Sequence, residues 1–266
     1  MISKILNSIL AVVFLSLVLT LAYKELMRPK TVSTMFEPAD SNEKKASYSK
    51  AEIEAIVRDY ILNNPKDLIL SLEKFQKEKK HDVSNKQSEF IKNNLDKMRT
   101  IGEPPTMGNK EGSMKIIAFF DYHCSYCRKS YKIDKQLLSQ DPNVQIILRP
   151  VPILGEGSLN TIKVALAVHK IAPDIFPNFH EDIMQLDKID ETSIKDVLSK
   201  YELDRSLLDN EINSYNMTQI ISQNLNFAAN LGVTGTPSYV INDQFIKGFL
   251  DLDQLKQIIL HIRSKD

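Results

Sequence analysis

Two cysteines separated by two residues, Cys124 and Cys127, constrain this chain more than any other feature of its sequence. They follow an apolar run, Met114–Phe120, that predicts a buried strand, and they precede a helical pattern over Arg128–Leu138. Cys124 is therefore expected at the N-terminus of a helix, where unpaired backbone N–H groups and the helix dipole favour negative charge. Such a position lowers the pKa of a thiol, and the thiolate is the species that attacks disulfides.

Other uses of a cysteine pair explain this spacing less well. The 266 residues contain no further cysteine, and the histidines lack metal-ligand spacing, whereas a structural zinc site needs four ligands. A c-type haem site needs histidine directly after the second cysteine, and Arg128 is there. An inert structural disulfide would remove very little chain entropy because its loop is so short. No cofactor or resident metal is expected; a carrier site for a soft ion such as copper stays as a minor alternative.

The N-terminus predicts export. Lys4 precedes an uncharged apolar run, Ile9–Tyr23, which has the form of a signal peptide, and Thr20–Ala22 offers small residues for cleavage. We expect a signal peptide over residues 1–22. The alternative is an uncleaved anchor, because Ile5–Tyr23 is close to the ~20 residues that cross a bilayer. In either case the rest of the chain lies outside the cytoplasmic membrane, in the periplasm, where disulfides persist.

Residues 23–47 are polar, contain Pro29 and Pro38, and are expected to form a flexible spacer. Residues 48–100 are mostly helical in pattern. Ser49–Glu52 forms a capping box in front of an apolar helical face that runs from Ile53 to Ile61.

A second helix is expected to start at Pro65, after Asn63-Asn64. About 35 residues of helix would extend ~50 Å, too far to fold flat on a small domain. Its apolar face needs a partner, and another copy of the chain is the simplest one, so this segment is expected to mediate self-association. Packing of these helices on the catalytic domain of their own chain is the alternative. Lys+Arg and Asp+Glu both number 34, so nothing in the charge balance indicates nucleic acid as a partner.

The second domain is expected over residues 101–266, after a Pro- and Gly-containing linker at Ile101–Lys110. Besides the elements around the cysteines, the pattern predicts a second buried strand, a helical insert, a hairpin and a final helix. In order these are Val144–Val151, helices over about 155–231 (Ser158–Ile171, Ile175–Leu186, Ser193–Leu198 and Asp209–Leu231, the last ended by Gly232), Ser238–Ile241 with Phe245–Gly248, and a helix capped by Asp251. This order describes an α/β domain in two parts. A β-α-β unit comes first, a β-β-α unit comes last, and a helical unit is inserted between them.

The chain resembles the thioredoxin superfamily in its cysteine pair, its helical insert and its motif Gly235-Thr236-Pro237. The insert in particular is typical of the DsbA-type thiol–disulfide oxidoreductases of that superfamily. The resemblance covers roughly residues 105–266. It implies a thioredoxin fold in which the bond before Pro237 is cis and packs against the cysteines. It also implies that the backbone of Thr236 pairs with a bound peptide strand.

Some residues resemble a different branch of that superfamily. Ser125-Tyr126 stands where DsbA proteins usually have Pro-His, and Tyr126 and Thr236 are closer to the DsbC-type isomerases. The N-terminal helical segment also resembles isomerases and the related trimeric ScsC proteins. The family often places a buried acid six residues before the first cysteine, as a proton acceptor for the second. Ala118 is there in this chain, which leaves Asp121 or a water molecule as candidates.

The expected function is that of a protein thiol–disulfide oxidoreductase in the periplasm. It would act on unfolded or cysteine-containing exported proteins. A membrane redox partner would then oxidise or reduce the cysteine pair and so restore its starting redox state. The candidate residues are the nucleophile Cys124, the resolving Cys127 (which together form the redox-active disulfide), the tuning residues His123, Ser125 and Tyr126, and the substrate-binding Thr236 and Pro237. His123 is either a solvated polar residue or a cation that stabilises the thiolate. The alternatives are an oligomeric disulfide isomerase or reductase, and a non-enzymatic binding or holdase protein with a passive disulfide.

Overall fold

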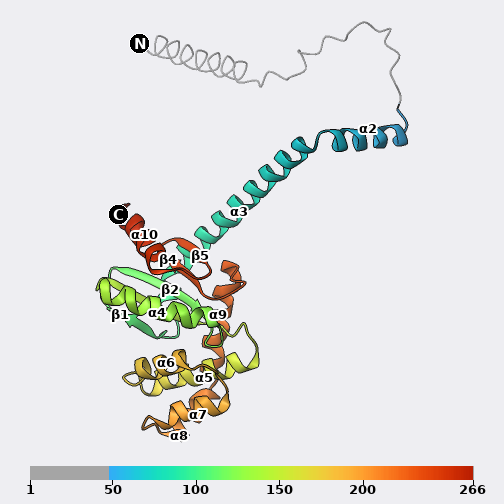
Figure 1. Cartoon of the computed structure of the whole chain (residues 1–266). Coiled ribbons are helices and arrows are strands. Elements are labelled where there is room, and N and C mark those ends of the chain that lie inside the picture. The colour runs from blue at the N-terminus through green and yellow to red at the C-terminus, as the bar shows by residue number, and fades with distance from the viewer. Residues whose placement is uncertain (1–47, 266) are drawn as a thin grey trace, which may run out of the picture. The chain divides into compact units, whose positions relative to one another are not determined.

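The computed structural model describes residues 48–265, so the segments expected as signal peptide and spacer lie outside the described residues. Two compact units divide at Leu68–Ile69. In chain order the elements are α2 (Lys50–Asn63), α3 (Pro65–Thr100), β1 (Thr106–Gly108), β2 (Met114–Phe120), α4 (Ser125–Gln140), β3 (Val144–Pro150), α5 (Glu156–Ile171), α6 (Phe176–Gln185), α7 (Glu191–Ser199), α8 (Arg205–Ile212), α9 (Tyr215–Leu231), β4 (Ser238–Ile241), β5 (Gln244–Lys247) and α10 (Leu252–Arg263) (Figure 1).

Helices α2 and α3 begin where their capping residues predict. The Ser49 side chain accepts the Glu52 N–H, and the Glu52 carboxylate accepts the Ser49 N–H, so the predicted capping box is confirmed. Asn64 ends α2, and α3 starts at Pro65 and continues for 36 residues. Within residues 48–265, no helix combines the length and the apolar character that crossing a bilayer requires.

The sheet has five strands in the order β1-β3-β2-β4-β5. Strands β2 and β3 are parallel, and the other three pairings are antiparallel. Both central strands are almost entirely buried, since helices cover both faces of a parallel pair. The predicted linker at 101–110 is wrong in one respect, because β1 lies within it and pairs with β3 along the edge of the sheet.

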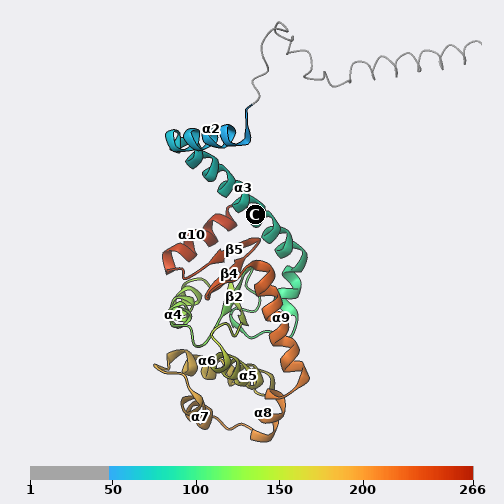
Figure 2. The same ribbon diagram turned by 90° about the vertical axis from the view of Figure 1, so that its right-hand side faces the viewer.

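Helices form a layer on each face of the sheet (Figure 2). One face packs against α4 and α10 through a large apolar core that extends into the insert. The other face packs against α9 and the C-terminal part of α3, where Ile91, Met98 and Leu231 are fully buried. The α/β fold with an inserted helical unit is confirmed. The left-handed cap at Gly232 (φ 68°, ψ 39°) and the Asp251 cap of α10 are confirmed as well.

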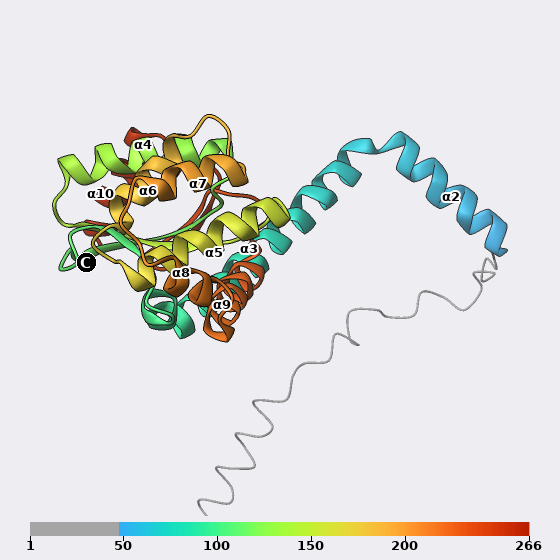
Figure 3. The same ribbon diagram turned by 90° about the horizontal axis from the view of Figure 1, so that it is seen from below.

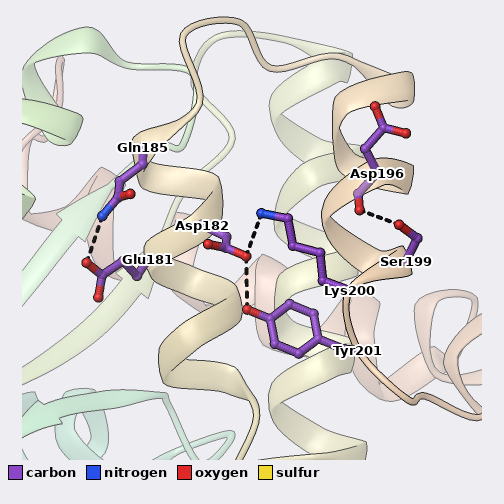
Figure 4. A network of polar contacts seen from close by, with 7 residues as sticks. All are labelled: Glu181, Asp182, Gln185, Asp196, Ser199, Lys200 and Tyr201. Atoms are coloured by element: carbon purple, nitrogen blue, oxygen red, sulfur yellow. Dashed lines mark hydrogen bonds and ion pairs between the residues drawn. The ribbon is translucent and has the colours of Figure 1, made fainter.

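The insert consists of α5 to α8, gathered at one end of the sheet (Figure 1). Viewed from that end, α6 lies beside α4, and α5 lies beside α9 (Figure 3). Asp182 on α6 accepts hydrogen bonds from Lys200 Nζ and the Tyr201 hydroxyl, each 3.0 Å long, and so ties α6 to the end of α7 (Figure 4). The single helix predicted over Asp209–Leu231 is wrong, because Ser214 caps a new helix by accepting the Met217 N–H.

A buried arginine on β3 joins the sheet to the end of α3. Arg149 is fully buried and donates to the carbonyl oxygens of Met98 (2.8 Å), Ile101 (2.8 Å) and Lys97 (3.2 Å). It also donates to the Asn224 side chain on α9 at 3.0 Å. Burial lowers the pKa of Arg149 to about 10, so the guanidinium stays charged at neutral pH. Its charge faces the C-terminal carbonyl groups of α3, where the helix dipole is negative.

Candidate active site

The two cysteines lie at the junction between β2 and α4, as predicted. Cys124 is the N-cap residue of α4 and Cys127 is in its first turn. Both are free thiols; Cys124 is half-buried, and Cys127 is only 2% exposed. The buried Asp121 holds the loop in shape, because its carboxylate accepts the backbone N–H groups of His123 (2.9 Å) and Leu154 (3.1 Å).

The surroundings of Cys124 favour its thiolate. A hydrogen bond from the Cys127 thiol is the largest effect that lowers the pKa of Cys124, and burial opposes it. The Thr236 side chain and the backbone N–H groups of Cys127 and Tyr126 lower the pKa further, to about 5. These backbone groups belong to the first turn of α4, whose N–H groups have no partner within the helix. Cys124 is therefore almost fully ionised at neutral pH.

Cys127 has the opposite character. Burial raises the pKa of Cys127 strongly, and the neighbouring Cys124 raises it further. The proton thus stays on Cys127 while Cys124 ionises. The pair therefore consists of a partly exposed thiolate and a buried, protonated thiol, and a thiolate is the species that attacks in thiol–disulfide exchange.

The segment before β4 faces the cysteines. The Thr236–Pro237 peptide bond is cis, as the resemblance implied, and Pro237 is buried beside Cys127. The Cys124 thiol donates to the Thr236 carbonyl oxygen at a sulfur–oxygen distance of 3.2 Å. The buried Thr236 hydroxyl has no other hydrogen-bond partner among residues 48–265, and the Thr236 side chain is one of the groups that lower the pKa of Cys124.

The residues predicted to adjust the pKa of Cys124 differ in exposure and in the direction of their side chains. Ser125 and Tyr126 are exposed; the Tyr126 ring lies 6.2 Å from that of Phe249 and carries the Lys129 ammonium 5.0 Å from its centre. The His123 imidazole Nε2 lies 3.0 Å from the Thr161 hydroxyl oxygen on α5, so its ring is directed to the insert.

Sequence reasoning missed a group of polar residues behind Cys127. Ser130 and Asp134 on α4 and Tyr239 on β4 are all buried. Residues 127, 130 and 134 are spaced at i, i+3 and i+7, which places them on one face of a helix. An acid on the same face of α4 as Tyr131 and Leu137, the face that the helix buries, is the signal that could have found Asp134.

Comparisons with known proteins agree with this geometry. A family model described as a DSBA-like thioredoxin domain matches residues 115–260, and one described as the copper resistance protein ScsC N-terminal domain matches residues 50–80. A thioredoxin-like oxidoreductase from Silicibacter pomeroyi DSS-3 is similar, with 32% identity and a TM-score of 0.59 over 63% of this chain and 95% of that one.

Two further relatives come from other bacteria. Proteus mirabilis ScsC, in a transitional conformation, has 26% identity and a TM-score of 0.60 over 81% of this chain and 97% of that one. Disulfide bond formation protein D of Bacillus subtilis is 25% identical over 181 residues, which are 60% of this chain and 77% of the relative.

Proposed function

The chain belongs to the DSBA-like thioredoxin domain family of thiol–disulfide oxidoreductases, and we propose that it exchanges disulfides in exported proteins through Cys124 and Cys127. One observation supports this proposal above the others. An accessible cysteine with a pKa of about 5 lies in hydrogen-bond contact with the segment before a cis-proline, and a buried protonated thiol lies one turn behind it.

The proposed reaction proceeds in two steps. The Cys124 thiolate attacks one sulfur of a substrate disulfide, forms a mixed disulfide and releases the other substrate sulfur as a thiolate. Cys127 then attacks the Cys124 sulfur, which closes the Cys124–Cys127 disulfide and frees the substrate. The substrate disulfide gains two electrons and the enzyme pair loses two; the reverse sequence oxidises a dithiol substrate. During both steps the backbone at Thr236 would pair with the substrate strand, and Pro237 would pack beside it.

The low pKa of Cys124 also bears on the direction of exchange. A stabilised thiolate favours the reduced pair, which makes the oxidised pair a strong oxidant. A membrane redox partner would then reset the pair. We place this chemistry outside the cytoplasmic membrane because disulfides persist there, in agreement with the export signal expected over residues 1–22.

Reduction of insulin by the purified protein in the presence of a small thiol tests the proposal. We expect turbidity from the precipitating insulin B chain well ahead of the thiol-only reaction. A holdase with a passive disulfide would leave the wild-type reaction at that background. This outcome would overturn the proposed function.

A second candidate function, disulfide isomerisation by an assembly, is favoured by α2. Five apolar side chains of its stripe are between 43% and 57% exposed: Ile53, Ile56, Val57, Tyr60 and Ile61. Water contact with so many apolar groups is unfavourable, and each buried methylene would gain ~0.8 kcal/mol. We propose that this face associates with the same face of another copy of the chain. The match of residues 50–80 to an ScsC N-terminal domain supports the proposal.

Placing a charge on the stripe should separate assembly from chemistry. We expect Ile56→Glu to reduce the solution mass measured by light scattering to that of a monomer. The same change on the opposite face, Ala55→Glu, should leave the mass unaltered. If isomerisation needs the assembly, Ile56→Glu should no longer catalyse the refolding of scrambled ribonuclease, but it should still catalyse the reduction of insulin. A wild-type protein that is monomeric at micromolar concentrations would contradict the proposed self-association.

A further inference from the structure

A small cavity lies behind Cys127, between the sheet and the helices α4 and α6. Its volume is about 20 Å³. This is enough for one water molecule, which needs roughly 10–15 Å³ and two to four polar partners. The side chains that line it include Ala118 on β2, Cys127, Ser130 and Asp134 on α4, His180 on α6 and Tyr239 on β4.

The polar groups around this cavity have few partners of their own. In the described part of the chain, the buried hydroxyl groups of Ser130 and Tyr239 lack a hydrogen-bond partner of good geometry, although Ser130 lies near enough to Tyr239 to lower the pKa of that tyrosine against the larger effect of burial. Asp134 is 7% exposed, and burial alone shifts the pKa of its carboxyl group, with no hydrogen bond or charge from another residue between 48 and 265 contributing. Buried polar atoms are rarely left without a partner, so the two hydroxyl groups beside this carboxylate indicate a bound water molecule.

Among residues 48–265, no cation lines the cavity opposite the Asp134 carboxylate. The titratable groups there are Cys127 and Tyr131 on its own helix, Tyr239 on β4 and His180 on α6. Burial raises the pKa of both tyrosines and lowers the pKa of His180 to about 3, so all three are neutral at pH 7. His180 is in addition hydrogen-bonded to the Tyr122 hydroxyl through Nδ1, at 2.8 Å. Without a compensating charge, burial raises the pKa of Asp134 to about 7.

We propose that Asp134 is the proton acceptor for Cys127, through a water molecule that Ser130 and Tyr239 hold in the cavity. This inference rests on the proposed disulfide exchange. In the resolving step the Cys127 thiol gives its proton to the water, which passes a proton to the Asp134 carboxylate. The Cys127 thiolate then bonds to the Cys124 sulfur, and the substrate sulfur leaves as a thiolate. When the reaction runs in reverse, Asp134 returns the proton to the departing Cys127.

Two neighbouring positions explain why the acid comes from α4. Ala118, on β2, lines the cavity with a methyl group and offers no acid, whereas Asp134 lines the same cavity from α4. Asp121 is the other acid near the cysteines, but its two carboxylate oxygens accept the backbone N–H groups of His123 and Leu154. Asp121 therefore stabilises the loop through both of its carboxylate oxygens, whereas Asp134 is free to accept the proton of Cys127.

The test separates the two chemical steps with 5,5′-dithiobis(2-nitrobenzoate) under single-turnover conditions. Attack by Cys124 releases the first coloured thiolate, and ring closure by Cys127 releases the second. In Asp134→Asn we expect the first phase to stay within about twofold of wild type and the second to slow about 100-fold at pH 7, the usual range for a lost general base. The second phase of the wild type should rise with pH through about 7, and the variant should lose this inflection. Asp141→Asn, at the C-cap of the same helix and outside the lining of the cavity, is the matched control.

Each outcome has a distinct meaning. A second phase in Asp134→Asn with the rate and pH profile of wild type would overturn the role of Asp134 and leave the proposed function intact. A wild type that releases no thiolate in the first phase would instead overturn the proposed function. If Asp134→Asn also impairs the first phase, Asp134→Glu decides: an inflection retained at a shifted pH supports the inference, and a flat profile contradicts it.

Discussion

Serine in place of Cys124 is expected to reduce insulin reduction to the uncatalysed background, a loss of about 10³-fold or more, because a hydroxyl at this position cannot supply the attacking anion. Serine in place of Cys127 should have a different effect. Cys124 keeps its helix N-terminus and still attacks, but the mixed disulfide cannot be resolved from within the enzyme. We therefore expect Cys127→Ser to accumulate as a covalent complex with its substrate.

Mass spectrometry of the unreduced reaction mixture measures both expectations. Cys127→Ser should gain the mass of one substrate chain, and a reductant should remove it. Cys124→Ser should gain nothing under the same conditions. If the two variants behaved in the reverse way, Cys127 would be the nucleophile, and the assignment of roles from burial and pKa would be wrong.

Replacement of Arg149 by methionine is expected to lower the free energy of unfolding by about 3 kcal/mol or more. The change removes the donors for the carbonyl groups of Lys97, Met98 and Ile101 and for the Asn224 side chain. Each buried acceptor left without a donor costs about 1–3 kcal/mol. The removal of a buried charge offsets part of this loss, because the guanidinium no longer has to be desolvated. Chemical denaturation of the reduced protein at pH 7 measures the difference.

Arg263 provides the control for this measurement. It also makes two hydrogen bonds, to the Asp141 carboxylate at 2.7 and 3.2 Å, but it lies at the surface. Arg263→Met should therefore cost less than about 1 kcal/mol. If the two substitutions lowered the free energy of unfolding equally, the buried hydrogen bonds of Arg149 would contribute no more than surface ones. The end of α3 would then be stabilised mainly by its apolar contacts.

Local signals in the sequence predict the parts of the site that depend on few residues. An apolar run, a cysteine pair and a helical pattern place Cys124 at the N-terminus of α4 without any knowledge of the tertiary structure. The capping boxes at Ser49 and Asp251 and the glycine cap at Gly232 were predictable for the same reason. Each depends on side chains and backbone groups within one turn of helix.

Features that depend on distant pairing were not predictable from the sequence. The three residues of β1 have no strand pattern and gain their structure from hydrogen bonds with β3. The cavity behind Cys127 joins residues from β2, α4, α6 and β4, so only the folded chain shows that Asp134 lies beside a cysteine. The four hydrogen bonds of Arg149 also join segments about 50 to 75 residues apart.

Titration of Cys124 is the decisive experiment, since every proposed step begins from its thiolate. Thiolate absorbance near 240 nm, followed in the reduced wild type, should rise with a midpoint at about pH 5. The rate of alkylation by iodoacetamide should follow the same curve and then stay level to pH 8, because Cys127 keeps its proton throughout this range. A midpoint close to 9, the ordinary value for a cysteine, would show that the site does not stabilise the thiolate and would overturn the proposed role of Cys124.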